Sequence, residues 1–267
     1  MVTFSRERNT DGVTERLFDL TVSGERVPAV LWSPEGAKGP RPLICMGHGG
    51  SQHKKVGSLA DRARRYAQSF GYATLALDAP GHGDRISREE ADALAKDIAD
   101  RAAGRGTRGG PFTELMRSMN QRARQAIPEW SAAIDAVQTL DFIGADNPVG
   151  YWGISMGSTI GIPFVAAEPR VKCAVFGLAG LRESEKAFGE AARAITIPIE
   201  FVFQWDDAVA PRDGGVALFN AFSSKEKTMH ANPGAHGQIP PFENGSWERF
   251  FIRHLGTAAD AALARAA

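Results

Sequence analysis

The apolar residues of this chain fall into short runs of two kinds. Residues 14–22 and 26–33 alternate polar and apolar positions, and Gly24 lies between them. Alternation with a period of two is typical of strands with one buried face, so the two segments predict an antiparallel hairpin. The later runs are apolar almost throughout, which is typical of parallel strands that are covered on both faces. These later runs are residues 42–46, 73–77, 148–154, 171–177 and 199–204, with a weaker one at 226–231.

Helical patterns separate these strands. Residues 57–70 place Leu59, Ala63, Tyr66 and Phe70 on one apolar stripe, as an amphipathic helix requires. Further helical segments follow the later strands, at residues 155–167, 212–222 and 245–255. Alternation of strands and helices predicts an α/β fold with a mostly parallel, doubly wound sheet of eight strands, which begins with the N-terminal antiparallel hairpin.

One segment interrupts the alternation. About seventy residues separate the fourth and fifth predicted strands, and a simple crossover needs far fewer. Residues 87–103 and 113–140 have helical patterns, the second of which is interrupted or kinked near Pro128. We interpret residues 84–127 as a small helical insertion in a single domain of residues 1–267. The insertion is either a surface decoration or a cap over the active site. Its apolar face would comprise Phe112, Leu115, Met116 and Met119.

Composition and charge narrow the class of protein. Lys and Arg together number 31, as do Asp and Glu, so the formal net charge is zero and favours neither nucleic acid nor an anionic membrane as a partner. No apolar run approaches the roughly 18 residues of a membrane span, and the N-terminus lacks the apolar core of a secretion signal. Cys45 and Cys173 lie in apolar runs and are expected to be buried free thiols. We therefore expect a cytoplasmic protein that acts on a small molecule.

The segment Gly153-Ile154-Ser155-Met156-Gly157 has the form G-x-S-x-G and lies between an apolar strand and a helical stretch. A serine at such a tight turn is held in a strained backbone conformation, and crowding there requires small residues two positions before and after it. The turn lifts the hydroxyl above the sheet. It also places the serine at a helix N-terminus, where the helix dipole favours developing negative charge. Ser155 is therefore a candidate nucleophile.

A serine hydroxyl needs a base within hydrogen-bond reach, and the base needs an acid that orients it. Asp206 and Asp207 follow the seventh predicted strand, at the end of the sheet where sites gather in parallel sheets. His230 lies within the last strand pattern and His254 lies in the final helix, so we expect structural roles for both. His236 lies in a loop after the last strand, and this loop is free to bend toward the serine. His236 is therefore the candidate base, and Asp206 and Asp207 are both candidates for the acid.

Five short motifs resemble those of the α/β-hydrolase superfamily. They extend over nearly the whole chain and comprise HGG at 48–50, DAPGHGDR at 78–85, GISMG at 153–157, DDAVAP at 206–211 and GAH at 234–236. Within the superfamily the chain is similar to the dienelactone-hydrolase and acyl-peptidase-like esterases, because an antiparallel hairpin precedes HGG and a DxPGHG loop follows the fourth strand. True dienelactone hydrolases carry a cysteine nucleophile where this chain has Ser155, so the resemblance does not extend to a dienelactone substrate.

The resemblance implies an α/β-hydrolase fold and a catalytic triad in the chain order serine, acid, histidine. In that order Ser155 is the nucleophile and His236 is the base. The family pattern places the acid four residues before a proline, with a valine two residues after the acid. This pattern selects Asp207, with Asp206 as the alternative.

The resemblance also implies an oxyanion hole formed by two backbone N–H groups, those of Met156 and Gly50. Asp78, His82 and Asp84 match a structural turn of the family and fit no metal-binding pattern, so we expect no metal and no other cofactor. Side chains that could line the substrate pocket are His53, Phe112, Met116, Met119 and Trp205.

The expected reaction is hydrolysis of a carboxylic ester through an acyl-enzyme intermediate. Ser155 would attack the carbonyl carbon while His236 accepts and returns the proton. The same triad would also serve an acyltransferase, a thioesterase, an amidase or a C–C hydrolase, and the sequence leaves these reactions open. A non-catalytic ligand-binding relative is the remaining alternative, and the complete set of triad residues argues against it.

Overall fold

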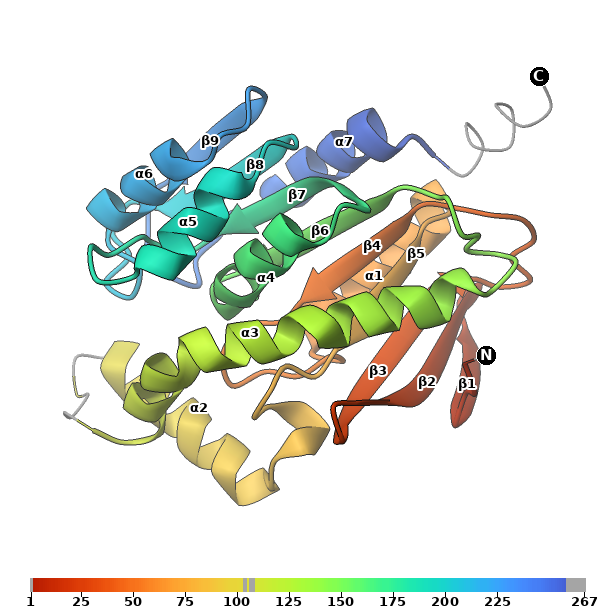
Figure 1. The fold of residues 1–267 in the computed structure, drawn as a ribbon, viewed down its shortest axis with the longest axis horizontal. Helices are drawn as coiled ribbons and strands as arrows, with labels where there is room; N and C mark the ends of the chain where they lie inside the picture. The colour runs from red at the N-terminus through yellow and green to blue at the C-terminus, as the bar shows by residue number, and fades with distance from the viewer. Residues whose placement is uncertain (1, 103–104, 106–108, 258–267) are drawn as a thin grey trace.

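The computed structural model describes residues 2–102, 105 and 109–257, and it is built around one mixed sheet (Figure 1). Within the described residues, nine strands lie in the order β1-β2-β3-β5-β4-β6-β7-β8-β9. Neighbours from β1 to β5 pair antiparallel, and neighbours from β5 to β9 pair parallel. The strands are β1 Arg6–Thr10, β2 Val13–Val22, β3 Glu25–Pro34, β4 Leu43–Gly47, β5 Ala73–Leu77, β6 Val149–Ile154, β7 Val171–Gly177, β8 Ile199–Gln204 and β9 Lys227–Asn232.

The predicted hairpin is formed by β2 and β3. Their register runs from Val13 opposite Pro34 to Val22 opposite Glu25. The two turn residues between them, Ser23 and Gly24, have φ angles of 53° and 83°. Two successive positive φ angles are typical of a type I′ turn, whose twist matches the twist of the paired strands. The hairpin is therefore tight and in the predicted position.

The sheet has one strand more than the eight that the sequence predicts. The additional strand is β1, which lies at the edge of the sheet and pairs with β2 alone. Its five residues are all polar and all exposed, so no hydrophobic pattern marks it. The predicted α/β class and the mostly parallel, doubly wound sheet are confirmed.

Helices cover both faces of the sheet (Figure 1). On one face α1 and α7 bury residues such as Leu59 and Phe251, which belong to the same apolar cluster as Met46 of β4. On the other face α3, α4, α5 and α6 bury residues such as Ile134 and Ile160. The sequence predicted all of these helices except α5. The helices are α1 Gly57–Phe70, η1 Gly83–Arg85 (a short 3-10 helix), α2 Arg88–Ala102, α3 Pro111–Gln138, α4 Met156–Ala167, α5 Lys186–Ala194, α6 Arg212–Ala221 and α7 Glu243–Leu255.

The predicted insertion consists of η1, α2 and the first half of α3. The sequence predicts either an interruption or a kink near Pro128, and the structure shows no interruption, because α3 continues through this residue. Its second half packs on the sheet through Ile134 and Val137 and serves as the crossover helix. The first half and α2 extend past the sheet (Figure 1). One continuous helix therefore links the core to the insertion.

Two further expectations concern the cysteines and the membrane. Cys45 and Cys173 are buried free thiols, as predicted, and burial raises the pKa of both well above the usual range of a thiol. Among the helices that the structure describes, none combines the length and the apolar composition needed to cross a membrane.

Candidate active site

Ser155 occupies the sharp turn between β6 and α4. Its φ and ψ angles are 57° and −122°, a conformation that a residue with a side chain rarely adopts. The turn is crowded: a Cβ added to Gly153 would lie 2.8 Å from the carbonyl oxygen of Gly157. A Cβ added to Gly157 would lie 2.6 Å from the carbonyl oxygen of Gly47. Both glycines of the G-x-S-x-G motif are therefore required by close backbone approach.

The structure brings Ser155, His236 and Asp207 together in one hydrogen-bonded chain. The Oγ of Ser155 lies 2.8 Å from Nε2 of His236. The Nδ1 of His236 lies 2.6 Å from Oδ2 of Asp207. This network assigns the ring proton to Nδ1, which leaves Nε2 free to accept the proton of the serine hydroxyl. The geometry is that of a nucleophile, a base and an orienting acid. The catalytic roles of the three residues remain a prediction.

Asp207 is held as a carboxylate by its surroundings. Its side chain is 1% exposed, and Oδ1 accepts hydrogen bonds from the backbone N–H groups of Val209, at 2.7 Å, and Ala210, at 2.9 Å. Burial by itself would raise the pKa of Asp207. The hydrogen bond from His236 and the two backbone donors outweigh burial, so the pKa lies below the usual value of an aspartate. The group is therefore ionised at neutral pH.

Asp206, the alternative acid, has a different position. It is exposed, and its Oδ2 accepts a hydrogen bond of 3.1 Å from the backbone N–H of Gly234. This contact ties the loop after β8 to the loop that carries His236. Asp206 thus contacts the backbone of the histidine loop, whereas Asp207 contacts the histidine ring.

A residue that the sequence did not single out holds the histidine loop. Gln204, the last residue of β8, is fully buried. Its Nε2 donates to the carbonyl oxygens of Pro233, at 3.3 Å, and of Gln238, at 2.7 Å. These two carbonyls flank His236 on either side. The amide group of Gln204 therefore holds both ends of the loop that carries His236. In the sequence, the one signal of this role is the position of Gln204 at the end of a strand, just before the candidate acids.

The other two histidines lie in the elements that the sequence predicts. His230 lies in β9, where its Nδ1 is 2.7 Å from Oε2 of Glu243. His254 lies in α7, with its ring 4.6 Å from the ring of Phe250. His230 thus contacts α7, His254 contacts a ring of its own helix, and the histidine that contacts the serine is His236.

The two predicted oxyanion-hole donors lie at neighbouring backbone segments. Met156 is the first residue of α4, and the first N–H groups of a helix have no partner within the helix. Gly50 lies in the loop after β4, which contacts the start of α4 where Gly47 approaches Gly157. His48 braces this loop: its Nδ1 lies 2.8 Å from the carbonyl oxygen of Gly49, and its Nε2 accepts a hydrogen bond from the N–H of Ala79.

The predicted pocket residues occupy varied environments. Met119 is buried and packs in the core, and Met116 is partly buried. His53 is exposed, and Trp205 is 50% exposed beneath the guanidinium of Arg212, which lies 4.5 Å from the ring centre. The side chain of Phe112 lies outside the described part of the structure. The described residues of this set lie in the loop after β4, in α3 and in the loop after β8, and their role in a substrate pocket remains a prediction.

Asp78 and Asp84 have a partner that the sequence analysis did not identify. The Nζ of Lys54 lies 2.6 Å from Oδ2 of Asp78 and 2.5 Å from Oδ2 of Asp84. The backbone N–H groups of Lys54 and Asp84 also donate to the carboxylate of Asp78. The lysine ammonium thus occupies the position between the two carboxylates, and the segment serves as a structural turn.

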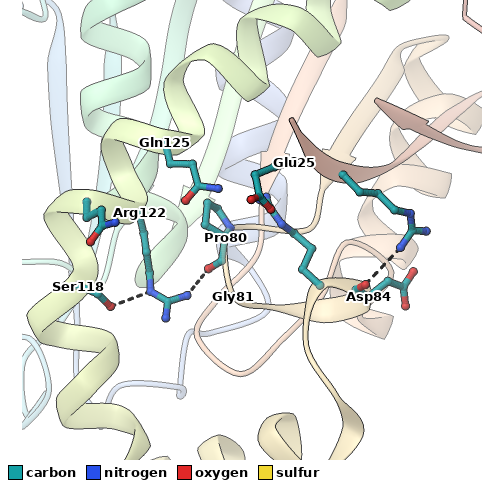
Figure 2. Close-up of a pocket in the computed structure, with 10 residues that line it drawn as sticks. Glu25, Pro80, Gly81, Asp84, Ser118, Arg122 and Gln125 are labelled. Carbon is teal, nitrogen blue, oxygen red and sulfur yellow. Dashed lines mark hydrogen bonds between the residues drawn. The ribbon is translucent and has the colours of Figure 1, made fainter. Parts of the chain in front are cut away.

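A polar cavity of about 460 Å³ lies between the β2–β3 turn, the loop after β5 and α3 (Figure 2). Arg122 reaches into it from α3, and its guanidinium donates to Ser118 Oγ, at 2.8 Å, and to the carbonyl oxygen of Pro80. Gln125 lies beside Arg122 on α3, and Glu25 lines the cavity from β3 (Figure 2). The lining residues do not include the serine, histidine and aspartate of the hydrogen-bonded chain, so this recess is a separate feature.

Comparison with solved structures finds close similarity to esterases. A PEG-bound complex of a cold-adapted esterase from an Arctic intertidal metagenomic library is 31% identical, with a TM-score of 0.76, over 95% of this chain and 99% of that chain. The native structure of such an esterase from the same source is 27% identical, with a TM-score of 0.71, over 96% and 99%. An acetyl xylan esterase from Paenibacillus sp. R4 is 16% identical with a TM-score of 0.72, over 96% and 88%, and shows the fold alone. No protein-family model and no curated protein matches the chain.

Proposed function

This chain belongs to the α/β-hydrolase family of serine esterases, and we propose that it hydrolyses small carboxylic esters with Ser155 as nucleophile, His236 as base and Asp207 as orienting acid. The observation that carries this proposal is the unbroken hydrogen-bonded chain, with contacts of 2.8 Å from serine to histidine and 2.6 Å from histidine to aspartate. A serine hydroxyl is a weak nucleophile until a base removes its proton, and Nε2 of His236 is in position to do so.

In the first half of the reaction, Oγ of Ser155 attacks the carbonyl carbon of the ester while its proton moves to His236. The carbonyl oxygen becomes an oxyanion, which the N–H groups of Met156 and Gly50 stabilise. A well-placed donor contributes about 3 kcal/mol to such a transition state. The bond to the alcohol oxygen then breaks, and the protonated histidine delivers its proton to the departing alkoxide. The products are an acyl-serine and a free alcohol.

In the second half, a water molecule replaces the alcohol. His236 accepts one proton from the water as its oxygen attacks the acyl carbon, and the same two N–H groups stabilise the second oxyanion. The bond to Ser155 breaks, and the histidine returns the proton to the serine oxygen. Asp207 keeps the ring in the tautomer that each step needs and stabilises the imidazolium that forms twice per cycle.

We also propose that the insertion at residues 84–127 forms a cap over the bound substrate. The support is its position beside the loop after β4. A Cβ added to Gly50 would lie 3.6 Å from Cδ1 of Ile98 and 3.8 Å from Cδ2 of Leu115. Ile98 belongs to α2 and Leu115 to α3, so both helices of the insertion contribute apolar side chains next to an oxyanion donor. The acyl group of the substrate would contact these side chains.

Labelling with a fluorophosphonate probe tests the nucleophile. The wild-type protein is expected to form one covalent adduct, mapped to Ser155 by peptide mass spectrometry, and to hydrolyse p-nitrophenyl acetate. Ser155→Ala should abolish labelling and lower kcat by a factor of at least about 10⁴, because the remaining groups cannot form the acyl-enzyme.

The matched control for this experiment is Ser69→Ala, which removes an exposed hydroxyl on α1. Ser69→Ala should leave labelling and hydrolysis unchanged. Adduct formation that survives in Ser155→Ala, or a wild-type protein that neither reacts with the probe nor hydrolyses the ester, would refute the proposal.

A further inference from the structure

A second cluster of ionisable side chains lies away from the serine, on the face of β8 and β9 that α7 covers. Glu200 belongs to β8, His230 to β9, and Glu243 is the first residue of α7. The Nδ1 of His230 lies 2.7 Å from Oε2 of Glu243 and 3.7 Å from Oε1 of Glu200. One nitrogen and two oxygens from three elements therefore lie within 4.8 Å of one another.

The two carboxylates of this cluster are both buried, and both lie close to one imidazole. The side chain of Glu243 is 2% exposed and that of Glu200 is 7% exposed. Among the described residues, the imidazole of His230 lies near both carboxylates, and Arg249, which also acts on Glu200, is exposed. Burial, reinforced by the nearby Glu243, raises the pKa of Glu200.

One oxygen of the cluster has no hydrogen-bond partner. Glu243 is satisfied, because Oε1 accepts from Nδ2 of Asn232 at 2.8 Å and Oε2 lies against His230. Glu200 receives a hydrogen bond from Ser246, yet its buried Oε1 has none within the described residues. That orphaned oxygen is the one directed toward His230 and Glu243. A buried carboxylate oxygen without a partner costs free energy, and a cation bound at this point would remove the cost.

We propose that Glu200, His230 and Glu243 bind a divalent transition-metal ion, with Zn²⁺ as the preferred metal. Zinc binds carboxylate oxygens and imidazole nitrogens at about 2.0–2.2 Å, so the ligands of a tetrahedral site lie about 3.3–3.6 Å apart. The Nδ1 of His230 lies 2.7 Å from Oε2 of Glu243 and 3.7 Å from Oε1 of Glu200, one distance below that range and one above it. Side-chain movements of less than about 1 Å would bring both distances into the range. Imidazole with carboxylates favours zinc over calcium and magnesium, which prefer oxygen alone.

The site is open enough to exchange its ion with solvent. The side chain of His230 is 27% exposed, so water has access to complete the coordination. The ion would join β8, β9 and the N-terminus of α7. The strand β9 leads directly into the loop of His236, and Asn232 at its end is bonded to Glu243. The ion therefore has a structural role that supports the loop and no part in the reaction itself. No sequence pattern marks these three residues as a set, because only the fold brings their segments together.

Zinc titration of the chelator-treated full-length protein tests the site. Competition with a chromophoric chelator should show one equivalent of tightly bound Zn²⁺, and the thermal midpoint of unfolding should rise when zinc is added. Glu200→Gln keeps the shape of the side chain but removes a charged ligand, so it should weaken binding roughly tenfold to hundredfold. Glu190→Gln, an exposed change on α5, is the matched control and should bind zinc like the wild type.

Two measurements keep the outcome unambiguous. Because zinc can also bind a catalytic histidine, His236→Gln is titrated in parallel and should retain the equivalent of bound zinc. If Glu200→Gln does not fold, His230→Gln is titrated in its place. The absorption spectrum of the Co²⁺-loaded wild type is also recorded, and it should indicate a four- or five-coordinate site with nitrogen and oxygen ligands. A wild-type protein without one stoichiometric site, equal affinity in the ligand variants, or loss of the site in His236→Gln would each overturn the proposal.

Discussion

Two adjacent aspartates show how burial separates the roles of chemically identical residues. Asp207 is buried, receives two backbone N–H groups and contacts the ring of His236. Asp206 is exposed and contacts the backbone of Gly234. In the proposed mechanism the first orients the imidazole and stabilises the imidazolium that forms, and the second links two loops.

Asp207→Asn is therefore expected to lower kcat for ester hydrolysis by about 10⁴-fold. The N–H groups of Val209 and Ala210 would keep the amide oxygen at the Oδ1 position, so the NH2 group would face Nδ1 of His236 and the histidine would adopt the wrong tautomer. Asp206→Asn should change kcat by less than about tenfold, since the amide oxygen still accepts from Gly234. Steady-state kinetics with p-nitrophenyl acetate, together with circular dichroism to verify folding, measure both effects. A greater loss in Asp206→Asn would reverse the assignment of the two residues.

The candidate site residues that the sequence could bring forward are those that a local pattern marks. Ser155 stands in a short motif between a strand and a helix, and His236 stands in a loop after the last strand. Gln204 and Lys54 were not identified, because their partners are distant in the chain: Gln204 bonds residues about thirty positions away, and Lys54 bonds Asp78 and Asp84. A role that depends on contacts across the fold leaves no pattern among neighbours in sequence.

At the scale of elements, hydrophobic pattern predicted the strands and helices that bury apolar faces. The exceptions have physical reasons. The strand β1 has no apolar residue, and α5 has only nine residues, whose buried positions are Phe188, Gly189 and Ala192, so a single large apolar side chain marks its buried face. The helix α3 continues past Pro128, where local propensity favours a break, because its packing against the sheet and α4 outweighs the lost hydrogen bond.

The proposed cap makes a prediction about acyl-chain length. Ile98→Ala should enlarge the space beside Gly50 and raise kcat/KM for butyrate and hexanoate relative to acetate, by about tenfold, which is the effect of one or two methylene groups in an apolar pocket. Ile98→Trp should fill that space and shift the preference toward acetate. A series of p-nitrophenyl esters of increasing chain length measures both shifts.

Arg117→Ala, on the exposed side of α3, is the control for this series and should leave the chain-length profile unchanged. If neither substitution at Ile98 alters the profile, the insertion does not contact the acyl group and is a surface decoration.

At the scale of the whole molecule, two buried histidines make stability depend on pH. Burial lowers the pKa of His82 to about 4, with a contribution from neighbouring His48, whose own pKa burial also lowers. In the unfolded chain a histidine has a pKa of about 6.5. Between pH 6.5 and 4 the unfolded state therefore binds more protons than the folded state. The free energy of unfolding must then fall as the pH is lowered through this window.

His82→Gln should make this pH dependence shallower, because glutamine does not titrate. The slope that one such histidine contributes is on the order of 1 kcal/mol per pH unit. Urea unfolding at several values between pH 7 and pH 4.5 measures the slope for both proteins. Parallel slopes would show that His82 is not held neutral in the folded state.

The exposed strand β1 has a consequence for the association of one molecule with another. An open sheet edge presents unpaired N–H and C=O groups to any extended chain that approaches. Without β1 that edge would be β2, whose alternating apolar side chains suit it to pair with a neighbour's sheet. The edge is instead a short strand that includes Arg6, Glu7 and Arg8, whose charges resist burial between two sheets. A strand that adds almost nothing to the core thus opposes the joining of copies into extended sheets.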